Sequence, residues 1–221
     1  MTDIKKILGL DLISIKPYFT MKNLLILLLV SIAYVYFLKN PSSTFIVAMT
    51  FALLFASYPF LIGENAGIDG LYRLFGIRPR EVVLGRYLSA VILFFLSFIL
   101  GSILYIIISL IRNMGIDLDI LWYMISYLIV FLVVISFQYP IFFRYGYQQA
   151  RVFAMVPMFL LGFVGVIGGM LGETLFTKVE GLLEFILDHQ ALAIFIGGLI
   201  VLAIVIFSIS LSIKFYKKRD L

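Results

Sequence analysis

The chain of 221 residues contains no cysteine and only one histidine, and these absences exclude much of the chemistry that proteins perform. Without cysteine there is no disulfide, no thiolate nucleophile and no thiolate metal site. Metal-binding histidines usually belong to a cluster of ligands, whereas His189 stands alone and is interpreted as an interfacial residue. No HExxH, GxSxG or GxxxxGK[ST] pattern is present. We therefore expect no enzyme activity and no bound metal or cofactor.

Charged residues are also scarce. They make up 13% of the chain, whereas about a quarter of a soluble domain is charged. Hydrophobic residues make up 63%, and the mean hydropathy is +1.15, so we predict an all-α membrane protein with a single transmembrane domain over 1–221. Six apolar runs have about the 20 residues that cross a bilayer. The predicted spans are 20–38, 44–63, 86–111, 120–143, 152–172 and 190–213.

Lysine and arginine are almost confined to one side of this arrangement. Only Lys39, Arg112 and Lys178 fall on the other side, which leaves fourteen of the 17 on the basic side. Because positively charged connections stay in the cytoplasm, both termini should be cytoplasmic in a multi-pass protein of a prokaryotic inner or plasma membrane. This orientation accounts for the net charge of +5, so nucleic acid is not an expected partner.

The predicted spans lack ionisable residues in their middle. Ion-coupled carriers usually keep a carboxylate, a histidine or a broken helix at the membrane midplane. Pro59 and Pro157 could break helices, so an ion-coupled carrier or channel stays open as an alternative. A membrane assembly protein that transports nothing is the second alternative.

The first residues form an amphipathic segment that is too polar for a span. Its apolar side chains share one helical face, and Lys5 and Lys6 lie elsewhere. Such a segment predicts a helix over 1–17 that rests in the headgroup layer, and a frayed basic tail is the alternative. The apolar face consists of Ile4, Ile7, Leu8, Leu12 and Ile15.

Two features belong to the region around the fifth predicted span. The span contains two GxxxG pairs, which allow close approach of helix backbones within one chain or between two subunits. The following connection, 173–189, is too apolar to be fully solvated and predicts a short outer helix. The glycine pairs are Gly165 with Gly169 and Gly168 with Gly172.

The sequence predicts a short helix in the connection between the second and third spans, 64–86. Asp69 is expected to cap the first turn of this helix, and Gly76 to end it in the left-handed conformation. Pro79 suits the first turn of the next helix, with Glu81 near its positive end. The sequence therefore predicts a rigid element between two spans rather than a loose loop.

This short helix is predicted to be amphipathic. Leu71, Leu74 and Phe75 fall on one face at helical spacing. An apolar face in a cytoplasmic connection needs a partner surface or lipid to cover it, and arginines give it a basic edge. These arginines are Arg73, Arg78 and Arg80.

The same stretch resembles the signature of the six-span type-2 ABC exporter permeases that lack a fused ATPase. The matching residues are Glu64, Asp69, Leu71, Tyr72, Ile77, Arg78, Arg80, Glu81, Val82, Val83, Arg86 and Tyr87. The chain departs at Phe75–Gly76, where the family often has Leu-Pro. A second patch, Pro140 to Tyr147 with Arg151 beyond it, resembles the cytoplasmic connection after span four.

The resemblance implies a permease subunit that pairs with an identical or related permease and docks on separate ATPase subunits, which would hold ATP and magnesium. It also implies small amphipathic or antimicrobial peptides, such as phenol-soluble modulins, or other hydrophobic compounds as cargo. The implied ATPase-coupling residues are Glu64, Asp69, Leu71, Tyr72, Arg73, Leu74, Phe75, Arg78, Arg80 and Glu81.

Overall fold

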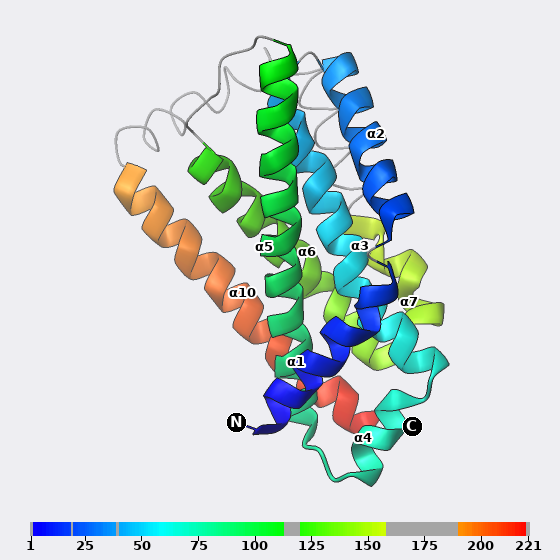
Figure 1. Cartoon of the computed structure of the whole chain (residues 1–221). Helices are drawn as coiled ribbons and strands as arrows, with labels where there is room; N and C mark the ends of the chain where they lie inside the picture. Colours follow the sequence, from blue (N-terminus) through cyan, green and yellow to red (C-terminus); the bar gives the residue numbers. More distant parts are fainter. Residues whose placement is uncertain (1, 19, 39, 113–119, 158–189, 220–221) are drawn as a thin grey trace.

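The computed structural model describes residues 2–18, 20–38, 40–112, 120–157 and 190–219, and these residues are almost entirely helical, with no strand among them. They form a bundle of long helices with shorter helices gathered at one end (Figure 1). The elements are α1 (Thr2–Ile15), η1 (Lys16–Tyr18), α2 (Met21–Leu38), η2 (Pro41–Ser43), α3 (Thr44–Asn65), α4 (Ile68–Leu74), α5 (Pro79–Ile111), α6 (Ile120–Tyr145), α7 (Tyr147–Ala154) and α10 (Gln190–Lys218).

Four segments of the described chain are long and apolar enough to cross a membrane, and α1 with α2, which meet at 75°, add a fifth if counted together. These segments coincide with predicted spans two, three, four and six, and α2 coincides with span one. The predicted outer helix, the four glycines of the GxxxG pairs and most of span five lie outside the described residues. The four segments are Pro41–Asn65, Pro79–Ile111, Ile120–Tyr145 and Ile196–Lys218.

The long helices α3, α6 and α10 run in the same direction. Phe45 contacts Tyr123 and Phe60 contacts Phe143, so α3 and α6 are parallel. Further along, Ser208 donates a hydrogen bond to the carbonyl of Ser136 and Phe215 lies 5.0 Å from the Arg144 guanidinium, so α6 and α10 are parallel too. The helix α5 runs the opposite way along α3, because Gly101 lies near Ala48 and Arg86 near Phe60.

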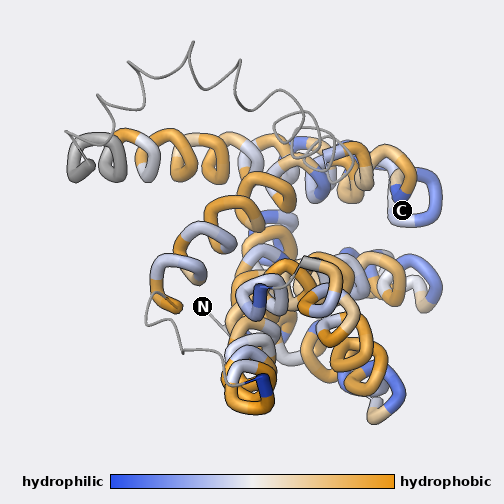
Figure 2. Tube along the Cα trace, turned by 90° about the horizontal axis from the view of Figure 1, so that it is seen from above, coloured by the Kyte–Doolittle hydropathy of each residue, from blue (hydrophilic) through white to orange (hydrophobic). Residues whose placement is uncertain are grey.

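Aromatic rings fill the space between α3, α5 and α6. Phe45 stacks on Phe98 at 4.8 Å between centroids, and Phe60 lies 4.8 Å from Tyr139. Offset and edge-to-face pairs of this kind add to the gain from burying the rings. Outside this core the helix shafts remain hydrophobic along their length (Figure 2), as expected of surfaces that face lipid.

A proline inside α6 is compensated by α10. Pro140 has no N–H for the carbonyl of Ser136, four residues earlier. The Ser208 hydroxyl donates to that carbonyl instead, and Ser208 also lies 2.6 Å from the Tyr87 hydroxyl of α5. These polar contacts attach α10 to α5 and α6 in the half of the bundle that carries α4.

Candidate functional site: the α4 end of the bundle

The short helix α4 lies at the same end of the bundle as both chain termini (Figure 1). It starts after Gly67, which has a φ of 63°, and it spans Ile68–Leu74. Gly76 then adopts a φ of 68°, and the Ile77 N–H donates to the Tyr72 carbonyl at 2.9 Å. This is a Schellman ending, so the predictions of the helix and of its terminating glycine are confirmed. Pro79 opens α5 and Glu81 lies in its first turn, as predicted.

The prediction that Asp69 caps α4 is wrong. The N-cap residue is Gly67, without a side-chain cap hydrogen bond, and Asp69 lies in the first turn with its carboxylate directed into the bundle. Asp69 is 6% exposed and accepts a hydrogen bond from Arg86 Nη2 at 3.2 Å. The Tyr216 hydroxyl of α10 donates to it at 3.4 Å, and Arg219, directly after α10, lies 3.6 Å away. Asp69 therefore connects α4 to two long helices.

Arg86, the last residue of the predicted connection 64–86, lies inside the bundle. Because α5 begins at Pro79, Arg86 stands two turns inside the helix and is only 1% exposed. Its guanidinium lies 4.5 Å above the Phe60 ring, a favourable cation–π position. Room for it comes from Gly63, where a Cβ would approach Nη2 to 2.8 Å. Its second carboxylate neighbour is Asp11, 3.8 Å from Nε.

The N-terminal helix α1 contributes that second carboxylate. Ile7, Asp11 and Ile15 are all buried, and their spacing of four residues places them on one face. Ile7 packs so closely on α5 that a Cβ on Gly85 would come within 2.7 Å of it. The predicted apolar face is thus confirmed, but it packs on protein. Asp11 is not among the predicted site residues. An acidic residue within an apolar stripe is the sequence signal that could have identified it.

Glu64 connects α3 to α7. Its carboxylate accepts hydrogen bonds from the backbone N–H groups of Tyr147 at 2.5 Å and Gln148 at 3.1 Å. These N–H groups belong to the first turn of α7, where the helix has no other acceptor for them and a negative charge is favoured. The structure therefore joins the two stretches, 64–87 and 140–151, that the sequence singled out separately.

The outward face of α4 is apolar and exposed. Leu71, Leu74 and Phe75 are 47%, 83% and 78% exposed. Leu71 and Phe75 also line a groove of about 500 Å³ between α4 and α1. Residues of α1 form the other wall, with Lys6, Ile7 and Leu10. The groove and the exposed trio form one continuous surface, which we call the α4 docking face, defined by Leu10, Leu71, Leu74 and Phe75.

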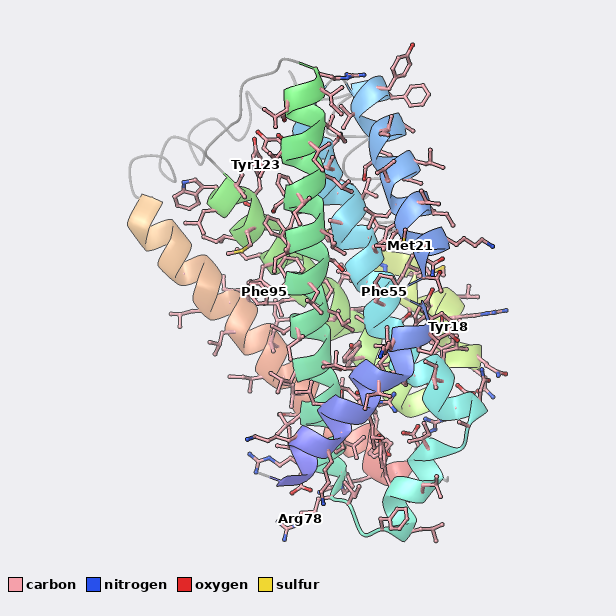
Figure 3. The ribbon with its side chains drawn as sticks, viewed as in Figure 1. Tyr18, Met21, Phe55, Arg78, Phe95 and Tyr123 are labelled. Atoms are coloured by element: carbon pink, nitrogen blue, oxygen red, sulfur yellow. The ribbon has the colours of Figure 1, made fainter. Side chains whose placement is uncertain are left out.

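The remaining predicted residues divide between this face and the interior. Arg78 projects away from the bundle (Figure 3), and Arg80 is also exposed. Arg73 lies along the C-terminal end of α10 and donates to the backbone carbonyls of Tyr216, at 3.3 Å, and Arg219. Tyr72 is buried, and burial, reinforced by Asp11 and opposed by Arg86, raises its pKa to about 12. Tyr72 is therefore neutral at physiological pH.

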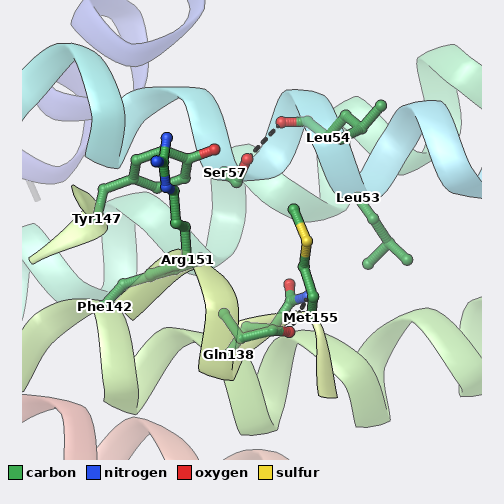
Figure 4. A pocket seen from close by; sticks show the side chains of 9 residues that line it. Leu53, Leu54, Ser57, Gln138, Phe142, Tyr147, Arg151 and Met155 are labelled. Carbon is green, nitrogen blue, oxygen red and sulfur yellow. Dashed lines mark hydrogen bonds between the residues drawn. The ribbon is translucent and has the colours of Figure 1, made fainter. Parts of the chain in front are cut away.

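Two of the other cavities in the described part of the chain border α6. A pocket of about 30 Å³ between α3, α6 and α7 is bordered by Ser57, Gln138 and Arg151 (Figure 4), and this volume suits about one water molecule. An apolar cleft of about 820 Å³ opens between α6 and α10, away from the α4 end. Its lining includes Trp122 and Leu202.

A protein-family model described as "ABC-2 family transporter protein" matches residues 6–217, which is nearly the whole chain. The chain belongs to the ABC-2 transporter family. Comparisons with curated proteins and with solved structures found no match. Membership in the ABC-2 family implies a membrane context and an ATPase partner, and the family consists of membrane subunits without an ATPase domain of their own.

The predicted ATPase-coupling residues of α4 form two groups: some hold the helix against the bundle, and others are exposed on its surface. Asp69 and Tyr72 face inward, whereas the apolar trio faces outward. From the sequence, all of these residues have the same predicted coupling role. The spacing shows which residues share a face of a helix, but it does not show which face is buried.

Proposed function

We propose that this chain is the membrane-embedded permease subunit of an ATP-driven exporter, working with a second permease and with separate ATPase subunits. The α4 docking face is the single observation that carries this proposal. Three large apolar side chains on a short helix project from the end of the bundle where both termini lie. Nothing in the described part of the chain covers them, so a partner of matching chemistry accounts for their exposure.

The energetics of docking favour this proposal. At about 25 cal/mol per Å² of apolar surface, burial of Leu71, Leu74 and Phe75 would contribute several kcal/mol, less the cost of association and of ordering the side chains. Arg78 and Arg80 beside the face would add orientation and association rate more than affinity. The matching partner surface is an apolar groove with acidic residues at its rim.

The attachment of α4 explains how docking could reach the spans. α4 is joined directly to α3 and α5, Asp69 connects it to α10, and Glu64 connects the end of α3 to α7. A partner that moves α4 would therefore tilt several helices together, as hinge and shear transitions require. Hydrolysis of ATP would belong to the partner.

The membrane orientation is proposed from charge. Lysine and arginine cluster near α4 and both termini, which supports a cytoplasmic location for this end. The parallel directions of α6 and α10 support a further crossing by the chain between them, consistent with six spans. A cysteine introduced at Gly70 tests the orientation, since the chain has no other cysteine. Labelling of that cysteine by an impermeant reagent from outside intact cells would contradict it.

The cargo is proposed to be a small amphipathic peptide or another hydrophobic compound. The cleft between α6 and α10 offers an almost wholly apolar lining, with Trp122 and Ser126 at one side. Such a surface suits the apolar face of an amphipathic molecule and offers no charged group for a small ion.

Reconstitution with a candidate ATPase tests the proposed function. The chain and the ATPase are co-expressed, purified through a tag on the chain, and placed in vesicles that contain a fluorescent amphipathic peptide. We expect co-purification, peptide-stimulated ATP hydrolysis, and transport that stops when the ATPase is catalytically inactive. Transport without any ATPase would favour an ion-coupled carrier, and a bound ATPase without transport would favour an assembly protein.

A further inference from the structure

The buried arginine of α5 has more hydrogen-bonding capacity than its present partner uses. Nη2 of Arg86 donates to Asp69 at 3.2 Å, whereas Asp11 lies 3.8 Å from Nε, within ion-pair range but longer than a hydrogen bond. Among the described residues, no hydrogen-bond acceptor pairs with Nε or Nη1. Arg86 therefore holds one carboxylate closely and has a second within reach.

The two carboxylates belong to elements that are attached differently. Asp11 lies on α1, which packs closely along α5 through Ile7 and Gly85. Asp69 lies on α4, a helix of seven residues with short connections on both sides. A force on the docking face would displace α4 more easily than α1, so the Arg86–Asp69 distance is the one that would change.

We propose that Arg86 exchanges its hydrogen-bonded partner from Asp69 to Asp11 when α4 is displaced, an inference that rests on the proposed role of α4 in ATPase docking. An unpaired charge in a buried site is strongly unfavourable. The second carboxylate keeps the Arg86 charge paired in both positions. Arg86 and Asp11 are thus positioning residues that allow α4 to move without leaving a buried charge alone.

The other half of the exchange is also provided for. When Arg86 leaves, Asp69 retains the Tyr216 hydroxyl of α10 at 3.4 Å and Arg219, the residue after α10, at 3.6 Å. After the exchange, Asp69 of α4 would be paired with the C-terminal region of α10, and Arg86 of α5 would be paired with Asp11 of α1. The four charged groups, Asp11, Asp69, Arg86 and Arg219, are balanced in both arrangements, as a two-state element requires.

Thermal unfolding of the purified chain in detergent tests the exchange without any ATPase. The variants are Asp11→Asn, Asp69→Asn and the double variant. If Arg86 exchanges partners, either carboxylate can serve alone, so the double variant should lower the midpoint by more than the sum of the single shifts. Additive shifts, or no effect of Asp11→Asn in the Asp69→Asn background, would overturn the proposal.

A third substitution keeps this test decisive if the double variant does not fold. Arg86→Met, added to the double variant, removes the unpaired charge and retains much of the apolar volume. We expect it to restore a folded protein and to raise the midpoint above that of the double variant. Failure of Arg86→Met to restore folding would overturn the proposal, because the damage would then not come from an unpaired Arg86.

A distance measurement follows the movement of α4. Spin labels are placed through Lys5→Cys on α1 and Gly70→Cys on α4, where an added Cβ would meet nothing within 4 Å. Asp69→Asn should shift the distance distribution in the chain alone, and ATPase with ATP should produce the same shift in the labelled chain that keeps Asp69. Asp11→Asn should suppress the ATPase-driven shift. An unchanged distribution in Asp69→Asn would overturn the exchange, whereas failure of the ATPase to bind would count against the proposed function alone.

Discussion

The inward and outward faces of α4 differ in both chemistry and exposure. The inward face presents Asp69 and Tyr72, which are buried, and Asp69 reaches Arg86 of α5 and Arg219, the residue that follows α10. The outward face presents Leu71, Leu74 and Phe75, which are exposed. In most soluble helices the apolar face is buried and the polar face is solvated, and α4 shows the reverse.

In α4, the residues that attach the helix to the bundle are therefore different from the residues that are available to a partner. An isolated helix of seven residues is not stable in water, so α4 is kept in place by its buried contacts, which are the Asp69 ion pairs and the packing of Ile68 and Tyr72 on the core. The outward side chains add nothing to the fold of the described chain and remain available to a partner. Changes on the inward face should therefore affect stability, and changes on the outward face should affect association only.

The largest effect on stability is expected from Arg86→Ala. Loss of the guanidinium leaves Asp11 and Asp69 as neighbouring carboxylates in a buried site, and removal of one member of a buried ion pair typically costs about 3–5 kcal/mol. The measurement is the free energy of unfolding by detergent titration. Arg80→Ala is the matched control, because Arg80 is an exposed arginine of the same helix, and it should change stability little. Equal effects of the two variants would contradict the assignment of Arg86 to the inward network.

The sequence was sufficient for the local structure of this region. Gly76 and Pro79 fixed the end of α4 and the start of α5, because both depend on backbone preferences of the residues themselves. The spacing of Leu71, Leu74 and Phe75 was likewise sufficient to place them on one face. Four of the six predicted spans coincide with apolar helices for the same reason.

The ion pairs could not be predicted from local patterns. Asp69 was assigned to a cap because aspartate is common there, but its partners lie on two other helices. Arg86 was assigned to the connection because charge normally marks the end of a span. A buried arginine is tolerated only where carboxylates from other elements meet it, and that depends on how α1, α4 and α5 pack. The hydrogen-bond partners of Glu64 lie 83 and 84 residues away in the sequence. They too depend on how the helices pack and could not be predicted from a local pattern.

A smaller effect is expected from Glu64→Gln. Both α7 N–H groups donate to the same Glu64 oxygen, so the glutamine oxygen can still accept them, but the favourable charge at the helix N-terminus is lost, at a cost of roughly 1 kcal/mol. Unfolding by detergent titration should detect this change, and Gln149→Ala, at an exposed position of α7, serves as the control. A loss as large as that of Arg86→Ala would mean that Glu64 has a role beyond the first turn of α7.

The smallest effect is expected from Arg78→Glu. Arg78 is exposed beside the docking face, so its charge should change the rate of ATPase association more than the affinity. The association rate, measured by surface-immobilised ATPase at rising salt, should fall at low ionic strength and approach the unmodified value at high ionic strength. A loss that persists at high salt would place Arg78 in a buried contact instead.

The claim that the outward face of α4 docks an ATPase is tested most directly by Phe75→Asp, with Phe37→Asp as its control. The two phenylalanines are 78% and 79% exposed and lie at opposite ends of the bundle. Co-purification with the ATPase and peptide-stimulated ATP hydrolysis are measured for both variants at equal membrane insertion. The account predicts that Phe75→Asp abolishes both co-purification and peptide-stimulated ATP hydrolysis, and that Phe37→Asp retains both. A Phe75→Asp variant that binds and stimulates the ATPase normally would contradict the account and leave α4 as a helix that rests on the membrane surface.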